Sequence, residues 1–570
     1  MATYRPTITG ARHMVSAGHY SAAHAAFQIL EAGGNAIDAG VAAGICVGVL
    51  QTDRVNFAGV APIMIYLAQP RKVINIDGLG TWPKAASIEY FRREHGGAMP
   101  PGILRTVMPA APAAWIKVLA EYGTMSFGEV AAAAIRLTRD GFSMHEFMAE
   151  YIRDHEASYR RWPSSAEVFL PNGRPPKVPE IFVQKELAAS IQYMVDEEAA
   201  HAAKGRAAGL RAARDAFYKG DIAQKIVKYH KENGGWVTAD DLASYDVRVE
   251  QPLTTRYRDV DLYACGPWSQ GPVLPQALNI LREVDLKALG HNSPAYIHHL
   301  AEALKLAFAD RHRYYGDPRF VEVPLDVLLS REYATARRKL IRDAEAWPEM
   351  PPAGNVKDFA AARPLPQPTA GEPAPLADTS YAAVIDEQGN AFSTTPSDGS
   401  SATPVIPGTG LCPSSRGSQS WTDPEHPAAL APGKRPRLTP NPALALKNGK
   451  IYMPFGSPGN DIQPQAMLQV FLNVVLWEME PQAAVEAPRF ATYSFPSSSE
   501  PHAYHPGRLN LESRIDAATV HALAKLGHKV APWSEIAWQA GAVCAIRVNE
   551  DTGLLEGAAD PRRPCYALGV

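Results

Sequence analysis

This 570-residue sequence has no net positive charge and few cysteines, two features that mark several classes of protein. Lysine and arginine number 56 against 59 aspartate and glutamate residues, so the formal net charge is −3. Without a net positive field to bind phosphates or anionic lipid, we expect neither nucleic acid nor a membrane as a partner. The cysteines include no CxxC pair, which argues against a zinc framework or a disulfide scaffold and fits a reducing compartment. They are Cys46, Cys265, Cys412, Cys544 and Cys565.

A long apolar run is also missing. The most apolar stretch, Ala36 to Leu50, contains Asp38 and is shorter than the roughly 20 residues that cross a bilayer, so it predicts a buried helix. The N-terminal segment has no apolar run behind a basic start, so it predicts no secretory signal, and we expect a cytoplasmic protein. What the sequence does contain is 46% hydrophobic and 20% charged residues, which is typical of a globular chain with a large core.

The first part of the chain predicts helices followed by strands. Residues 21–50 have apolar positions at helical spacing on both sides of a Gly33–Gly34–Asn35 turn, which predicts two packed helices. Residues 63–67 and 72–76 are short β-type runs separated by Pro70, and they predict a hairpin.

Two later segments predict exposed chain. Between residues 115 and 340 the pattern is mainly helical, but the Ala/Arg-rich segment 197–215 lacks a strong apolar stripe and predicts a solvated helix or an insertion. Residues 347–378 are rich in proline and poor in apolar residues, so they predict an exposed tether.

A threonine opens the strand that follows this tether. Residues 379–385 and 391–395 predict a β-hairpin around a polar turn. The hydroxyl of Thr379 can attack the carbonyl of Asp378, and hydrolysis of the resulting ester frees an α-amine, so that one residue supplies nucleophile and base. An α-amine has a pKa of about 7.7–8.0, which suits it to accept the hydroxyl proton. A threonine that begins a strand is more often only a β-former, so this segment alone leaves both interpretations open.

Several blocks in a fixed order extend the pattern over nearly the whole chain. They are EAGGNAIDAGVAAGICVGV around Gly34, residues 121–142, 217–226, 234–245 and 308–320, NGKIYMPFGSPGNDIQPQ at 448–465, VEAPRF at 485–490 and GAADPRR at 557–563. A collinear set of this kind is far more specific than any single motif. Together the blocks resemble the γ-glutamyltranspeptidase family of N-terminal nucleophile hydrolases.

The resemblance implies an α+β fold, a four-layer αββα sandwich made from a precursor that cuts itself once. The cut would fall between Asp378 and Thr379 and leave a large subunit, 1–378, and a small subunit, 379–570, intertwined in one structural domain. It implies a small-molecule amide substrate, no cofactor and no metal, and it allows a homo-oligomer. Ser397 matches the second hydroxyl that orients the nucleophile, and Gly459 and Asn460 match the loop whose N–H groups would stabilise the oxyanion.

The segments that hold the γ-glutamyl headgroup in this family differ here. Leu79 stands where glutathione-hydrolysing members have a carboxylate-binding arginine, and Arg416 lies where they bind the donor α-amine. We therefore expect the chemistry to be kept and the headgroup pocket to be lost, with an anionic or carbonyl-rich acyl group in its place. The substrate-binding candidates are Arg416, Arg54, Arg437, Thr439 and Asp461.

Three functions stay open at this point: an amidohydrolase for a non-γ-glutamyl amide, a γ-glutamyl hydrolase or transferase with a rebuilt pocket, and a non-catalytic relative. Arg416 has an alternative role as well, which is to pair with Asp461 or another internal carboxylate.

Other reactive residues have structural interpretations. His298 and His299 are adjacent, so they point about 100° apart on a helix and cannot share a metal face-on. Ser269 lacks the glycine that a nucleophile elbow needs before it. Residues 310–319 resemble a salt-bridged helix end.

Overall fold

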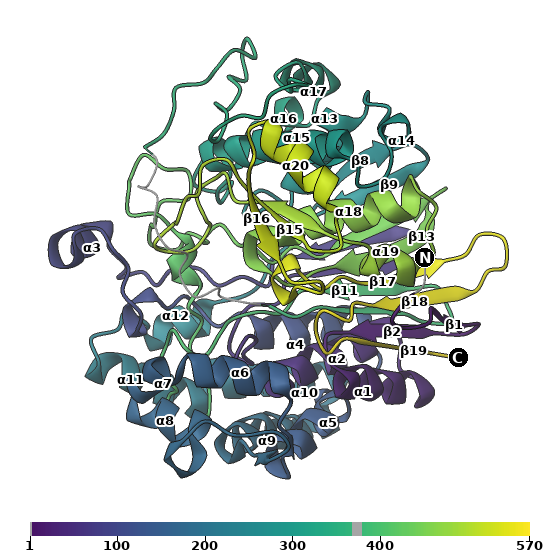
Figure 1. Ribbon diagram of the computed structural model, residues 1–570. Helices are drawn as coiled ribbons and strands as arrows, with labels where there is room; N and C mark the ends of the chain where they lie inside the picture. The colour runs from purple at the N-terminus through teal and green to yellow at the C-terminus, as the bar shows by residue number, and fades with distance from the viewer. Residues whose placement is uncertain (1–2, 367–378) are drawn as a thin grey trace.

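Two stacked β-sheets form the centre of the molecule, and helices cover both outer faces (Figure 1). The computed structural model describes residues 3–366 and 379–570. Strands of one sheet contact strands of the other, and each sheet carries helices on its outer face. The α+β four-layer αββα sandwich predicted from the sequence is confirmed.

Each of the two sheets has seven strands, and neighbouring strands run antiparallel. The first sheet has the order β1 (Ile8–Gly10), β18 (Leu555–Ala559), β17 (Cys544–Val548), β13 (Lys450–Gly456), β12 (Ala443–Lys447), β9 (Val260–Ala264) and β8 (Leu253–Tyr257). The second has the order β19 (Tyr566–Gly569), β2 (Met14–Ala17), β10 (Ala382–Ile385), β11 (Ala391–Thr394), β3 (Ile63–Leu67), β4 (Lys72–Ile76) and β7 (Val249–Glu250).

Two smaller sheets lie outside this pair. They are β14 (Phe490–Thr492), β15 (Arg508–Glu512) and β16 (Lys529–Trp533), and the pair β5 (Phe142–Ser143) and β6 (Ile181–Phe182).

Helices from the two parts of the chain form the outer layers. The second sheet is covered by α1 (Tyr20–Glu31) and α2 (Ala36–Leu50), backed by α4 (Ala111–Tyr122), α5 (Phe127–Arg139), α9 (Lys185–His201) and α10 (Arg206–Tyr218). The first sheet is covered by α13 (Val273–Leu281), α18 (Gln463–Val475) and α19 (Pro481–Glu486), and α15 (Pro294–Tyr314) packs on α13.

The remaining helices are short and lie around these layers. They are α3 (Ile88–His95), α6 (Glu146–Asp154), α7 (Glu156–Arg160), α8 (Pro163–Phe169), α11 (Asp221–Glu232), α12 (Ala239–Ser244), α14 (Leu286–Leu289), α16 (Leu325–Leu328), α17 (Arg331–Arg338) and α20 (Ala517–Lys525). The 3₁₀ turns are η1 (Ile103–Arg105), η2 (Pro171–Gly173), η3 (Ala202–Lys204), η4 (Arg416–Gln419), η5 (Asn460–Ile462) and η6 (Trp538–Ala540).

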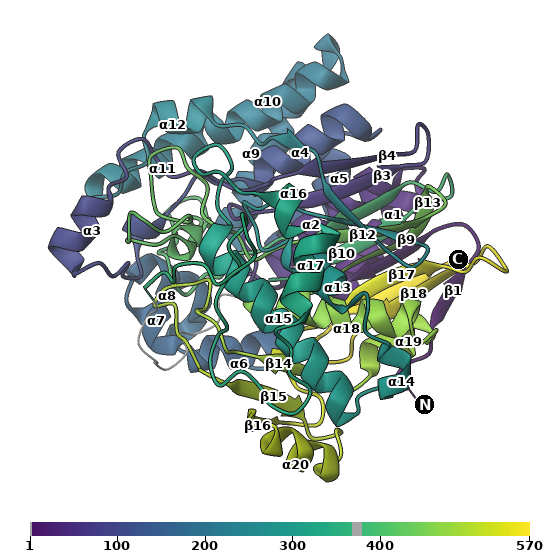
Figure 2. The same ribbon diagram turned by 90° about the horizontal axis from the view of Figure 1, so that it is seen from above.

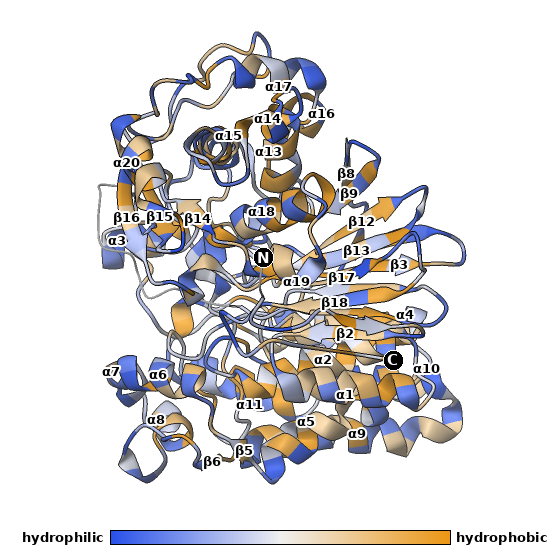
Figure 3. Ribbon diagram, turned by 45° about the vertical axis from the view of Figure 1, so that its right-hand side comes forward, coloured by the Kyte–Doolittle hydropathy of each residue, from blue (hydrophilic) through white to orange (hydrophobic). Residues whose placement is uncertain are grey.

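Each sheet contains strands from both sides of residue 378 (Figure 2). Thus β10 and β11 insert between β2 and β3, in a register that pairs Ala382 with Ala17 and Thr394 with Ile63. Hydrophobic residues gather on the central strands and the helix faces turned toward them (Figure 3). A hairpin in the middle of a buried sheet is hydrogen-bonded to a strand on each side, so the residues at its two ends are positioned rigidly.

Helix α2 supports this hairpin from the outer face. A capping box between Asn35 and Asp38 starts it, and all fifteen of its residues are buried. Glycine is required at two positions by close packing, since a Cβ on Gly40 would lie 2.1 Å from the ring of Phe392, and one on Gly44 would lie 2.5 Å from the ring of Trp115.

The predicted helix pair at 21–50 and the hairpins at 63–76 and 379–395 are confirmed. The segment 197–215 is corrected, because α10 buries one face against α4 and α9 and is not a solvated helix. Half of that face, Ala216, Phe217 and Tyr218, lies beyond residue 215, so the hydrophobic stripe looks weak within the segment.

The predicted exposed tether is also corrected over its first half. Trp347 donates its N–H to Glu302 (3.1 Å), and Gly354 donates to Asp310 (3.0 Å), so this part is bound to α15. Backbone hydrogen bonds to buried carboxylates fix it without the apolar pattern that a sequence search relies on. Residues 367–378 lie outside the described residues. Within the described chain, no helix combines the length and apolar character needed to cross a bilayer.

Candidate active site

Thr379 lies at the start of the β10–β11 hairpin, opposite Ser397 at its other end. The two residues form an antiparallel bridge just beyond the paired strands, and both are buried. The Oγ1 atom of Thr379 is 2.7 Å from the Oγ atom of Ser397. This placement allows Ser397 to orient the Thr379 hydroxyl. Asp378, on the other side of the predicted cleavage, lies outside the described residues.

An ion pair stands behind this pair of hydroxyls. Arg416, the first residue of η4, donates from Nη2 to the Oγ atom of Ser397. Its Nε atom is 3.8 Å from the Oδ2 atom of Asp398, and both side chains are almost fully buried. The sequence left open whether Arg416 pairs with Asp461 or with another internal carboxylate, and the structure places Asp398 beside it.

Asp398 is itself held in an unusual conformation. Its φ of 125° is costly for any residue with a side chain. Its carboxylate accepts from the Ser414 hydroxyl (2.5 Å), and from the N–H (2.9 Å) and hydroxyl (2.6 Å) of Ser415. Gly59 packs against this backbone so closely that a Cβ there would lie 2.3 Å from the Ser397 carbonyl oxygen. Ser414 and Ser415 therefore fix the Asp398 carboxylate, and the close packing of Gly59 fixes the Ser397 backbone.

The predicted oxyanion loop follows β13 and leads into η5 and α18. Gly459 has a φ of 119°, which glycine adopts without strain, and Asn460 begins η5. The side-chain amide of Gln463, at the start of α18, is 3.3 Å from Thr379 Oγ1, which places this loop beside the nucleophile. The Gln463 amide is assigned with its oxygen toward Thr379, because its nitrogen then donates to Thr439 O (3.1 Å) and Ser457 O (3.3 Å).

Thr439 lies next to the same loop. The amide nitrogen of Gln270 bridges the carbonyl oxygens of Thr439 (2.9 Å) and Asn460 (2.8 Å). The Gln419 amide donates to the Thr439 hydroxyl (2.9 Å) and to the side chain of Ser499 (3.2 Å). Thr439 is thus brought together with Asn460 and Thr379.

Asp461 is occupied by internal partners. Arg311 forms an ion pair with it, and Ser498 donates its N–H (2.8 Å) and hydroxyl (2.6 Å). Burial raises the pKa of Asp461, but Arg311 and the Ser498 donors outweigh it, so the net shift is downward. Asp461 is therefore an ionised support for the loop that contains Asn460.

Arg54 and Arg437 are less direct neighbours of Thr379. The Arg54 guanidinium forms an ion pair with Asp53 (3.0 Å) and lies 3.9 Å from the ring centre of Phe147. Its carbonyl oxygen accepts from the Asp398 N–H (3.1 Å), so its backbone contacts the site. Arg437 is fully buried and donates to the carbonyl oxygen of Arg311 (3.1 Å), and burial strongly lowers its pKa.

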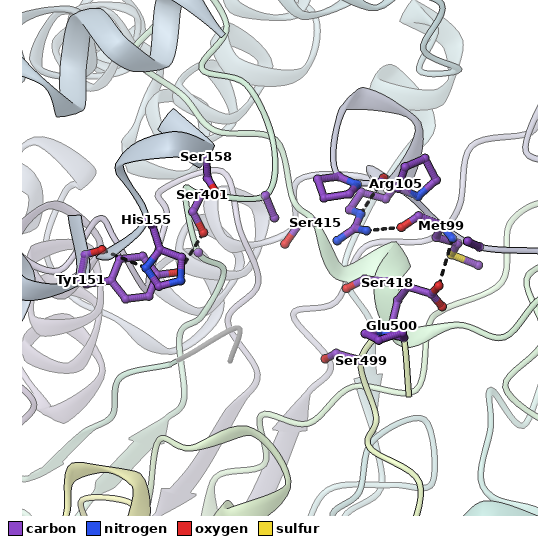
Figure 4. Close-up of a pocket in the computed structure, with 16 residues that line it drawn as sticks. Met99, Arg105, Tyr151, His155, Ser158, Ser401, Ser415, Ser418, Ser499 and Glu500 are labelled. Carbon is purple, nitrogen blue, oxygen red and sulfur yellow. Dashed lines mark hydrogen bonds between the residues drawn. The ribbon is translucent and has the colours of Figure 1, made fainter. Parts of the chain in front are cut away.

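A cavity of about 310 Å³ adjoins this centre (Figure 4). Arg105, the last residue of η1, and Glu500 lie on the same side of it, across from Tyr151 and His155 (Figure 4). Burial lowers the pKa of Arg105 to about 10 and raises that of Glu500. Ser415 connects the cavity wall to Asp398, and Ser499 connects it to Gln419. The other lining residues are Ala98, Met99, Pro100, Pro101, Tyr151, His155, Ser158, Gly399, Ser401, Ala402, Ser418 and Pro501.

The residues given structural interpretations are buried. His298 contacts His528, 230 residues away, through Nδ1 and Nε2 at 2.9 Å, and Lys305 donates to the nearby Glu302 (2.7 Å). Although His298, Glu302 and His528 lie within reach of one ion, the Lys305 ammonium already neutralises the only carboxylate of that group. The Ser269 hydroxyl donates to the Gly266 carbonyl oxygen (2.9 Å), which suits a turn rather than a nucleophile.

Asp398 is the site residue that sequence reasoning missed. It directly follows Ser397, and Asp398–Gly399 resembles an ordinary turn pair. Arg105 and Glu500 were missed as well, because they lie far apart in the sequence. An acidic residue next to a predicted orienting hydroxyl was the available signal.

Comparison with known proteins gives a consistent result. The family model described as Gamma-glutamyltranspeptidase matches residues 22–570. An acylase ACY 1 proenzyme of Pseudomonas sp. (strain SE83) is 34% identical over 97% of this chain and 92% of its own length. A glutathione hydrolase-like YwrD proenzyme of Bacillus subtilis (strain 168) is 31% identical over 99% of both chains. The crystal structure of a cephalosporin acylase from Bacillus halodurans superimposes with a TM-score of 0.87 at 27% identity, covering 100% of this chain and 98% of that one.

Proposed function

The chain belongs to the γ-glutamyltranspeptidase family, and we propose that it is a self-cleaving amide hydrolase whose nucleophile is Thr379. The observation that carries this proposal is the 2.7 Å contact between the Thr379 and Ser397 hydroxyls at the end of a hairpin in the centre of the sheet. Buried hydroxyls held by a rigid hairpin are pre-organised for attack on a bound carbonyl.

The proposed reaction has two halves. The Thr379 Oγ1 atom attacks the substrate carbonyl carbon while its proton passes to the Thr379 α-amine, and backbone N–H groups of Gly459 and Asn460 stabilise the oxyanion. The C–N bond then breaks, the α-ammonium returns the proton to the leaving amine, and an ester on Thr379 is left. Water attacks this ester by the same route in reverse, which releases the acid and restores Thr379.

Self-cleavage must come first, since the α-amine exists only after the bond between Asp378 and Thr379 is broken. The two products would be residues 1–378 and 379–570. Each sheet contains strands of both products, so they would stay together as one structural domain. The names of the acylase and YwrD relatives, both proenzymes, support the same processing.

For the substrate, we propose a small amide whose acyl group is polar but not γ-glutamyl. Leu79 is buried in an apolar cluster with Trp268 and Leu438, so this position offers no charge to a donor carboxylate. The cavity whose wall includes Ser415, the partner of Asp398, instead carries serine hydroxyls together with Arg105 and Glu500. Such a lining favours an acyl group with several hydrogen-bonding atoms.

A direct test combines intact mass with a substrate panel. Purified protein should give two fragments, 1–378 and 379–570, and Thr379→Ala should stay as one chain. The processed protein is then incubated with glutathione and with non-γ-glutamyl acyl amides, and the released amine is measured. Preferred release from glutathione would support the γ-glutamyl alternative, and an uncleaved wild-type chain with no turnover would support a non-catalytic relative.

A further inference from the structure

We propose that Arg416 and Asp398 act as a charge pair that directs the proton in the Thr379–Ser397 contact and lowers the basicity of the freed Thr379 α-amine. This inference rests on the proposed function, because it assigns positioning residues to that same nucleophile. It replaces the expectation that Arg416 binds the substrate.

The direction of the hydrogen bonds follows from what each group can donate. A guanidinium has only donors, so the Ser397 Oγ atom must accept from Arg416. The hydroxyl hydrogen of Ser397 is then available for the Oγ1 atom of Thr379, 2.7 Å away. With Ser397 as donor, the Thr379 proton can pass to its own α-amine, with the Gln463 amide oxygen, 3.3 Å from Oγ1, as a second acceptor. The oxygen that becomes negative during attack already has a donor in place.

The charge of Arg416 acts on the amine as well. Two short hydrogen bonds separate the guanidinium from Thr379 Oγ1, a distance of roughly 5 Å. A cation at this range disfavours a second positive charge on the α-amine, so the amine stays in its free-base form at lower pH. Asp398 stands on the far side of Arg416, 3.8 Å from Nε, and partly offsets this field.

Two other ion pairs and one further arginine lie around the centre. Arg54 forms an ion pair with Asp53, and Asp461 forms an ion pair with Arg311. Arg437 is buried and donates to the Arg311 carbonyl oxygen. Arg416 is the cation joined to Thr379 through the Ser397 hydroxyl, so its charge and that of Asp398 act on Thr379 most directly.

The geometry also explains why Asp398 is held so tightly. Its three donors, from Ser414 and Ser415, keep the carboxylate turned toward Arg416 in spite of the strained φ of 125°. An arginine without a fixed counter-charge would be costly to bury at this place. Asp398 therefore keeps Arg416 aimed at Ser397.

The test measures how fast Thr379 is sulfonylated by phenylmethanesulfonyl fluoride from pH 5 to pH 9. In this step the Oγ1–S bond forms, the S–F bond breaks, fluoride leaves, and the hydroxyl proton goes to the α-amine. Intact mass of the 379–570 fragment reports the adduct, so no natural substrate is required. The variants are Arg416→Gln, Arg416→Lys and Asp398→Asn, and Asn is tolerated at positive φ.

The two charge-removing variants are expected to shift the acid limb of this pH profile in opposite directions. Arg416→Gln leaves Asp398 unbalanced, so the midpoint should rise by about one pH unit and the plateau rate should fall about tenfold or more. Asp398→Asn leaves Arg416 unbalanced, so the midpoint should fall. Arg416→Lys keeps the charge and should hold the wild-type midpoint with a lower plateau.

Shifts in the same direction, or no shift in either variant, would overturn the proposal, since a purely structural role gives no opposite signs. A wild-type profile for Arg416→Gln combined with a raised KM for amides would restore the role in substrate binding. If Arg416→Gln is not cleaved, Arg416→Lys and Asp398→Asn still decide the sign. Absence of labelling at Thr379 in the wild-type protein would instead refute the proposed function itself, and with it this inference.

Discussion

The nucleophile centre and the cavity beside it are built in different ways. Thr379, Ser397, Asp398 and Arg416 lie within 38 consecutive residues, 379–416, and hold one another by short hydrogen bonds. The cavity is assembled from four separated segments, around residues 98–105, 151–158, 399–418 and 499–501. Its arginine and its carboxylate are bound mainly to backbone groups of neighbouring loops.

This difference assigns bond cleavage to the nucleophile centre and substrate specificity to the cavity. Most of the nucleophile centre comes from one hairpin and the loop after it, and the Gly459–Asn460 loop completes it, so it changes only if several contacts change together. A lining drawn from distant loops can vary one loop at a time, which is how one fold serves several substrates. The predictions below test this division, beginning with the largest expected effect.

Removing the nucleophile should have the greatest effect. Thr379→Ala should abolish both self-cleavage and turnover, with a loss of more than about 10³-fold, because no other residue combines hydroxyl and terminal amine. Denaturing electrophoresis and amide turnover measure the two effects. Thr379→Ser is the matched control and should keep partial activity in both. A cleaved and active Thr379→Ala protein would place the chemistry elsewhere.

Activity toward γ-glutamyl donors should be poor in the wild-type protein. Two charge-assisted contacts to the donor headgroup are missing, at Leu79 and Arg416, and each is worth about 1.5–3 kcal/mol. We expect turnover of a γ-glutamyl anilide to be roughly 10²- to 10⁴-fold below that of the best amide. Comparable rates for the two substrates would show that the cavity rebuilds the headgroup site from other residues.

Filling the cavity should change substrate affinity and leave self-cleavage intact. Ser418→Val adds volume at the cavity wall, and overfilling a site costs about 1–3 kcal/mol, so KM should rise about 5- to 100-fold. Ser143→Val, an exposed position in β5, is the control and should leave KM unchanged. Steady-state kinetics and the extent of cleavage are measured together. Loss of cleavage in Ser418→Val would mean that the two regions are not separable.

The smallest effect concerns pH and lies outside both regions. Burial, helped by nearby His145, lowers the pKa of His19 to about 3, and its Nδ1 atom caps α1 by accepting the Ser21 N–H (3.2 Å). The unfolded chain takes up a proton near pH 6.5 and the folded chain does not, so stability is lost as the pH falls from 6.5 toward 3.

Denaturant unfolding at pH 7 and pH 5 measures this loss. His19→Asn keeps the cap without a titrating group, so it should lose up to about 2 kcal/mol less than the wild type over this range. Equal losses would show that His19 does not titrate as its burial requires. A change in sulfonylation of Thr379 would show that α1 is coupled to the nucleophile centre.

Local patterns were sufficient for much of the fold. The helix pair at 21–50 and the hairpin after Thr379 could be predicted because turn residues and apolar spacing are local signals. The position of the segment 347–366 could not be predicted, because its backbone is bound to the carboxylates Glu302 and Asp310, which lie on a helix distant in the sequence. Helix α10 was misjudged for a different reason, because the aromatic part of its buried face, Phe217 and Tyr218, lies beyond the Ala/Arg-rich segment.

For this protein, the sequence by itself determined the family, the layered fold and the candidate nucleophile, since these depend on residue types in a fixed order along the chain. It also located Ser397 and the Gly459–Asn460 loop. Only the tertiary structure decided the partners of the charged residues, which paired Arg416 with Asp398, Asp461 with Arg311 and Arg54 with Asp53. A buried charge is stabilised by whichever opposite charge the fold brings within a few ångströms, and that choice is not set by separation in the sequence.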